Sequence, residues 1–256
     1  MNKVLIALTL ILFLLIITPI FLPNPNLMDI NNSLSSPSLE HILGTDSLGR
    51  DLFSRCINGA RNSFFISFSV ALLSTICGFI IGVLSLFSKL LDEVLMRIID
   101  SIKALPAILF ASLLIVTVGK SAPLLVLSLS TAFIPQCARL VRSEGKMQLQ
   151  SEYYLAGLSL GHDEKYYKII IVFRHTLMML INQIPFIFSS SVILEATLSF
   201  IGAGLDETSP TLGGVIQESR AFLLTRPYMI VFPILLILLF TLTFSYLGES
   251  IKKIRH

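Results

Sequence analysis

Six long apolar stretches divide this chain, and they constrain its fold more than any other feature. A helix needs about 20 mostly apolar residues to cross the hydrocarbon core of a membrane. Charged residues make up only 14% of the chain, whereas a soluble domain carries about 25%. We therefore expect an all-α polytopic membrane protein, a single transmembrane domain over 1–256, with six helices at 4–22, 63–88, 104–119, 122–141, 176–201 and 228–247.

The first stretch follows Lys3 and has the outline of a secretory signal. Its apolar run is longer than the roughly 7–15 residues of a signal-peptide core, and no Ala-x-Ala-like cleavage site follows it. We expect it to be a membrane helix that the protein retains.

Basic residues are unevenly shared between the two sets of loops. If both termini are cytosolic, thirteen of the 19 Lys and Arg residues fall in cytosolic segments and six fall outside. Cytosolic loops carry such an excess of basic residues. The sequence thus predicts cytoplasmic termini, a cytosolic loop at 142–175, and outer segments at 23–61 and 202–227.

The polar loop 142–175 has helical periodicity around a glycine. Apolar residues at helical spacing predict a helix over 146–160. Gly161 suits the position after its end, where a left-handed backbone is favoured. Asp163 then caps a second helix that continues into the fifth span. The exposed elbow 159–164 indicates that the loop is a docking surface for another protein. The alternative is an amphipathic helix that rests on the bilayer.

Two short motifs imitate catalytic or nucleotide-binding signatures. Residues 157–161 read Gly-Leu-Ser-Leu-Gly, but the nucleophile elbow of hydrolases follows a strand, and the pattern here is helical. The glycines that lead to Gly49 are spaced as in a P-loop, but Arg50 and Asp51 stand where Lys and Ser/Thr are needed. We expect no catalytic residue in this chain and no ATP site.

Metal and nucleic-acid binding are not predicted either. Cys56, Cys77 and Cys137 are widely spaced, and the four histidines show no ligand spacing. The basic residues are spread among the loops rather than gathered in a patch. The expected partners therefore include a lipid bilayer but no nucleic acid, and no metal site is expected.

Two acidic residues stand out. Asp46 precedes a run with apolar residues at i, i+4 spacing, which predicts that it caps a helix. Glu195 is the one acid well inside an apolar span, where a charge costs about 2.5–3.5 kcal/mol on insertion scales. Glu195 either lines or gates a pathway, or is paired within the bundle.

Several of these segments resemble one known family. Residues 43–51 read Leu-Gly-Thr-Asp-Ser-Leu-Gly-Arg-Asp, 198–204 read Leu-Ser-Phe-Ile-Gly-Ala-Gly, and 247–249 read Leu-Gly-Glu. Together they resemble signatures of the second permease in the peptide/nickel branch of ABC importers. The resemblance covers about residues 40–252.

The cytosolic loop adds a further motif. The order of Glu152, Ala156, Gly157 and Gly161 resembles the Glu-Ala-Ala…Gly coupling motif of such permeases. Gly157 replaces the second alanine. Met178 stands where a proline is common, which implies a weaker bend entering the fifth span.

The resemblance implies roles for particular residues. A short helix would fit a groove on the ATPase, with the coupling set Glu152, Ala156, Gly157, Ser159, Leu160, Gly161, His162 and Asp163. The seat for an extracytoplasmic binding protein would include Thr45, Asp46, Gly49, Arg50, Asp51, Gly213 and Gly214.

The resemblance also implies an assembly in the bacterial cytoplasmic membrane. This chain would pair with a homologous second permease, two ATP-binding subunits and a substrate-binding protein. ATP and Mg would bind only to the ATPase subunits. The expected function is import of di-/oligopeptides or of nickel, free or chelated. The rival is an ion-coupled secondary transporter or channel, which predicts paired ionisable residues in several spans, and only Glu195 fits that pattern.

Overall fold

The computed structural model of this chain describes residues 22–103 and 106–254. The first expected span, 4–22, therefore lies outside the described residues apart from its last position, as do the chain termini. The described elements are η1 (Ile30–Asn32), α3 (Leu52–Leu84), α4 (Lys89–Lys103), α5 (Ala107–Val118), α6 (Ala122–Leu149), α7 (Glu152–Ser159), α8 (Glu164–Phe200), α9 (Leu212–Ser219), η2 (Arg220–Phe222) and α10 (Tyr228–Ile254).

Four helices, α3, α6, α8 and α10, are long and apolar enough to cross a membrane. α5 has 12 residues and is only about 18 Å long, which is too short to cross alone. The expected span 104–119 is therefore wrong as a single helix. α4 and α5 pass the same test together, with a bend of 82° between them. The described residues thus contain four candidate spans, or five if this bent pair is one span.

Three predicted helix boundaries are also wrong, two of them because a side chain caps the helix elsewhere. α3 begins at Leu52 instead of residue 63, since the Asp51 carboxylate accepts a hydrogen bond from the Ser54 N–H at 2.7 Å. α6 continues to Leu149 rather than ending near 141. The helix expected over 146–160 is broken after Leu149, and Ser151 caps the separate helix α7.

α3, α6, α8 and α10 pack into one bundle whose core is rich in aromatic side chains. Phe188 of α8 stacks on Phe244 of α10 with ring centroids 3.9 Å apart. Phe64 of α3 meets the edge of Phe188 at 5.2 Å. Such aromatic pairs stabilise a core beyond the area that they bury.

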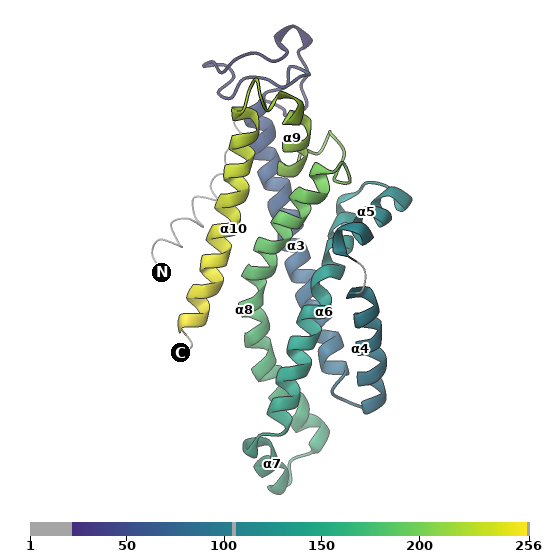
Figure 1. Ribbon diagram of the computed structural model, residues 1–256. Helices are drawn as coiled ribbons and strands as arrows, with labels where there is room; N and C mark the ends of the chain where they lie inside the picture. Colours follow the sequence, from purple (N-terminus) through teal and green to yellow (C-terminus); the bar gives the residue numbers. More distant parts are fainter. Residues whose placement is uncertain (1–21, 104–105, 255–256) are drawn as a thin grey trace.

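The two ends of the bundle carry different structures (Figure 1). α7 and its connection to α8 form one end, which we call the α7 end. Segment 22–51, α9 and η2 gather at the opposite end, which we call the α9 end. α8 connects the two ends, and it is continuous through Met178, with Pro185 inside it.

Candidate functional site

The α7 end is built by consecutive local signals. The Ser151 hydroxyl accepts a hydrogen bond from the Tyr154 N–H and caps α7. Gly161 follows the helix with φ of +89°, as its predicted position requires. The Asp163 carboxylate then accepts the Tyr166 N–H at 2.9 Å and starts α8. The predicted elbow and its second cap are confirmed.

Tyr167 holds α7 against α8. Its ring stacks on Tyr154 at 5.5 Å with an interplanar angle of 6°, and His162 stacks on it at 5.0 Å. A Cβ on Gly157 would lie 2.3 Å from the Tyr167 ring. The glycine that replaces the motif's second alanine therefore makes room for this ring. Tyr167 was not among the predicted site residues, although four of the six tyrosines lie in this loop.

Apolar side chains of α7 and of Leu160, the residue that follows it, are exposed. Tyr153, Leu155 and Leu160 present their side chains to the surroundings, and Leu160 is 83% exposed. Of the predicted coupling residues, only Gly157 is buried, and the exposed ones are Glu152, Ala156, Ser159, Leu160, Gly161, His162 and Asp163. α7 is thus a protruding helix that exposes apolar and polar side chains and packs on α8 through the stack of Tyr154 on Tyr167.

At the α9 end, the two aspartates of segment 43–51 have structural roles that differ from the prediction. Asp46 was expected to cap a helix, but Asp51 is the cap of α3. Asp46 instead accepts backbone N–H groups of Leu48 and Arg50 at 2.8 and 2.9 Å and closes a tight turn. The reason is local geometry, because a carboxylate can satisfy N–H groups two residues ahead within a turn.

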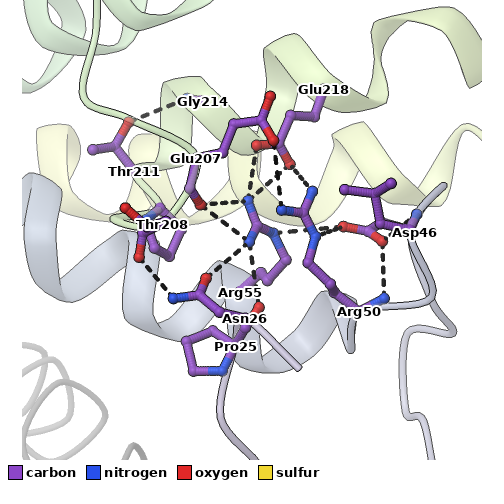
Figure 2. A network of polar contacts seen from close by, with 12 residues as sticks. Pro25, Asn26, Asp46, Arg50, Arg55, Glu207, Thr208, Thr211, Gly214 and Glu218 are labelled. Atoms are coloured by element: carbon purple, nitrogen blue, oxygen red, sulfur yellow. Dashed lines mark hydrogen bonds and ion pairs between the residues drawn. The ribbon is translucent and has the colours of Figure 1, made fainter. Parts of the chain in front are cut away.

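Two buried arginines join this turn to α9 (Figure 2). Arg50 donates to Asp46 at 2.6 Å and to Glu218 at 3.0 Å. Arg55, whose side chain is 1% exposed, donates to both oxygens of Glu218 at 2.8 and 2.9 Å. Burial raises the pKa of the Glu218 carboxyl, and the charges of Arg55 and Arg50 partly oppose that shift.

Most of the residues predicted to face a binding protein are therefore buried and support the surface of the α9 end rather than forming it. Thr45, Asp46, Gly49, Arg50, Asp51 and Gly213 are buried, and Gly214 is half-buried. Arg55 and Glu218 belong to the same network but were not predicted as site residues, since only folding brings α9 beside α3. A polar cavity of about 240 Å³ opens next to them, lined among others by Lys120, Asp206 and Gln217.

Glu195 lies between the bundle core and α9. It has no exposed surface within this chain. Ser63 of α3 and Ser199 of α8 donate hydrogen bonds to its two carboxyl oxygens at 2.8 and 2.7 Å. The structure thus places Glu195 in a hydrogen-bonded network inside the bundle, which agrees with the second of its two predicted roles.

Known proteins resemble this chain in sequence and in fold. The family described as "Binding-protein-dependent transport system inner membrane component" matches residues 74–254. A peptide transport system permease protein of Brucella suis is 31% identical over 234 residues, which are 90% of this chain and 78% of that protein. The glutathione transport system permease protein GsiD of Pectobacterium atrosepticum is 33% identical over 232 residues, covering 89% and 76%.

Solved structures agree at the level of the fold. An inward-facing MetNI methionine ABC transporter aligns with a TM-score of 0.63 at 15% identity, over 78% of this chain and 95% of that one. An amino acid ABC transporter aligns with a TM-score of 0.59 at 16% identity, over 78% and 94%. The fold is that of type I ABC importers.

The family match over residues 74–254 includes α6, the α7 elbow, α8, α9 and α10. It therefore contains the α7 end and, of the α9 end, α9 and η2 but not segment 22–51. The resemblance stated from the sequence is confirmed, and so is the expectation of a chain that is not itself an enzyme. The chain belongs to the family of binding-protein-dependent transport system inner membrane components: it is a multi-pass permease subunit of an ABC transporter.

Proposed function

We propose that this chain imports di- and oligopeptides, with small peptides such as glutathione within its range. The support is the kind of relative that it has, since the proteins reported above are named for peptide and glutathione transport. Of the two cargo classes expected from the sequence, these relatives favour peptides over nickel.

In this proposal the α7 end faces the cytoplasm and docks on an ATPase subunit. The exposed apolar side chains Tyr153, Leu155 and Leu160 support this, because exposed apolar groups on a protruding segment favour contact with a partner. The excess of basic residues in the flanking segments supports the same orientation, with both termini cytoplasmic. Two ATPase subunits would hold ATP and Mg, and a homologous permease would complete the pathway.

The α9 end would then face outward and receive the substrate-binding protein. The network of Arg50, Arg55 and Glu218 makes α9 and the turn at 43–51 one rigid surface. The neighbouring polar cavity offers hydrogen-bonding groups to an incoming partner. A preformed surface of this kind loses little freedom when a partner binds, which favours affinity.

α8 would transmit movement between the two ends. It has 37 residues, about 55 Å at 1.5 Å per residue. Closure of the ATPases displaces α7, the stack of Tyr154 on Tyr167 passes that displacement to α8, and substrate then crosses between the two permeases. No covalent bond is made or broken in this chain.

The ion-coupled transporter is not retained as an alternative, because the chain belongs to a binding-protein-dependent family. Glu195, the acid that the alternative relied on, has both carboxyl oxygens occupied by serine hydroxyls.

The exposed α7 elbow is the observation that carries this function, and a pair of glycines tests it. Gly161 and Gly202 each follow a helix, each have φ of +89°, and neither has a neighbour within 4 Å of an added Cβ. Gly161→Asp and Gly202→Asp therefore introduce the same strain and charge at opposite ends of α8. The measurement is co-purification of the full complex from detergent, followed by peptide uptake in proteoliposomes.

We expect Gly161→Asp to lose the ATPase subunits, or to retain them without uptake, while Gly202→Asp keeps them. Equal behaviour of the two variants would mean that the elbow is not the coupling site. A wild-type chain that recruits no ATPase would overturn the proposal as a whole.

A further inference from the structure

Glu195 is the deepest member of a hydrogen-bonded network that leads out of the bundle to α9. The network has two branches, one for each carboxyl oxygen. Ser63 of α3 donates to one oxygen, and Ser199 of α8 donates to the other. Neither branch ends at the serine.

Each branch reaches a backbone N–H at the start of α9. Ser63 accepts the Leu212 N–H at 3.1 Å. Thr211 donates to Ser199 at 3.2 Å and itself accepts the Gly214 N–H at 3.2 Å. The first N–H groups of a helix have no partner within the helix. Glu195 therefore anchors the relays that satisfy them, and a carboxyl group suits the positive end of a helix dipole.

The backbone of α9 also lies directly on α8 at this point. A Cβ on Gly213 would be 2.4 Å from the Ala196 carbonyl oxygen, next to Glu195 in the chain. Ser199 belongs to the last turn of α8, one turn beyond Glu195. The contact between α9 and α8 is thus made both by close packing and by the relays.

A residue of the transport pathway would need access to cargo or water. Glu195 has none within this chain, because α3, α8 and α9 enclose it. Burying a polar group is tolerated when it is hydrogen-bonded, and each carboxyl oxygen of Glu195 accepts a hydrogen bond. The geometry is that of a residue that holds α9 against α8 and α3.

We propose that Glu195 is a positioning residue that fastens α9 to α8 through Ser63 and Ser199, so that the outer surface moves with the helix that begins at the elbow. The consequence for docking rests on the proposed function, in which α9 receives the binding protein. The fastening itself does not.

The fastening is tested by hydrogen exchange of the α9 peptide in the purified full complex. Glu195→Ala removes both acceptors, and exchange over 212–219 is expected to rise about 10-fold or more. Glu195→Gln keeps the shape and part of the hydrogen bonding, so a smaller rise is expected. Ser63→Ala and Ser199→Ala each remove one branch and should give intermediate rises. These milder variants keep the test valid if Glu195→Ala does not fold.

The matched control is Glu93→Ala, which removes an exposed glutamate of α4. It should leave exchange over α9 unchanged. Unchanged exchange in Glu195→Ala and in both serine variants would overturn the fastening.

Uptake of alanine di- and tripeptides in proteoliposomes supplies the second readout. For a positioning role, Glu195→Gln and Ser199→Ala raise the apparent KM for the loaded binding protein by about 3- to 10-fold, with kcat within about 2-fold of wild type. Loss of kcat in Glu195→Gln with unchanged KM and unchanged α9 exchange would overturn the inference in favour of a pathway role. Faster α9 exchange with unchanged KM supports the fastening and refutes the docking surface of the proposed function.

Discussion

Arg55 of α3 and Glu218 of α9 are joined by two hydrogen bonds, although 163 positions separate them in the chain. Glu218 also accepts a hydrogen bond from Arg50. The carboxylates of Glu218 and Asp46 together neutralise the two buried guanidinium groups. This cluster sets where α9 lies relative to the start of α3.

Removing one partner of this cluster should be costly. Glu218→Ala leaves Asp46 as the remaining buried carboxylate beside the two buried guanidinium groups of Arg50 and Arg55. Loss of one partner of a buried ion pair destabilises by about 3 kcal/mol or more. We expect a clear fall in the thermal unfolding midpoint of the purified complex. Asp100→Ala is the matched control, because its pair with Arg139 also links two helices but is exposed, at 64% and 40%. That change should cost less than about 1 kcal/mol, and equal losses would refute the buried cluster as a support.

The contact between Gly157 and Tyr167 should make Gly157→Ala unfavourable for the packing of α7, although alanine usually stabilises a helix. Alanine is favoured over glycine in a helix by about 1 kcal/mol, yet here its Cβ would lie 2.3 Å from the Tyr167 ring. Gly157→Ala should therefore loosen α7 in the wild-type background. In a Tyr167→Ala background the same change should be neutral or stabilising. Limited proteolysis within 150–163 reports the result, and the same sign in both backgrounds would contradict it.

The adjacent glycines of α9 should respond unequally. Gly213→Ala meets the Ala196 backbone at 2.4 Å, and overpacking of this kind costs about 1–3 kcal/mol. Gly214→Ala meets only the Thr211 hydroxyl at 3.3 Å, and the gain in helix propensity offsets that, for a change below about 1 kcal/mol. Thermal unfolding of the two variants side by side measures the difference. A tolerated Gly213→Ala would show that α9 does not lie against α8.

Asp46 and Asp51 should also differ. Asp51→Ala removes a helix cap, worth about 1 kcal/mol. Asp46→Ala removes acceptors for two backbone N–H groups and for the Arg50 guanidinium, so it should cost more than about 2 kcal/mol. The unfolding midpoints of the two variants give the ranking, which the opposite order would contradict.

Local signals predicted much of the α7 end. The glycine after α7 and the Asp163 cap were recognised because each acts within a few residues of its own position. The break at Ser151 was missed, since apolar periodicity continues across it and a capping serine looks like any other polar residue. Tyr167 was missed because its partner Gly157 is ten positions earlier and on another helix.

The sequence by itself determined that the chain lies in a membrane and which family it resembles, because apolar length and short motifs are properties of contiguous residues. Only the tertiary structure decided that Arg55 meets Glu218 and that Glu195 lies beneath α9. The physical reason is that a buried charge needs a partner but does not specify which one. The partner is chosen by how α3, α8 and α9 pack together.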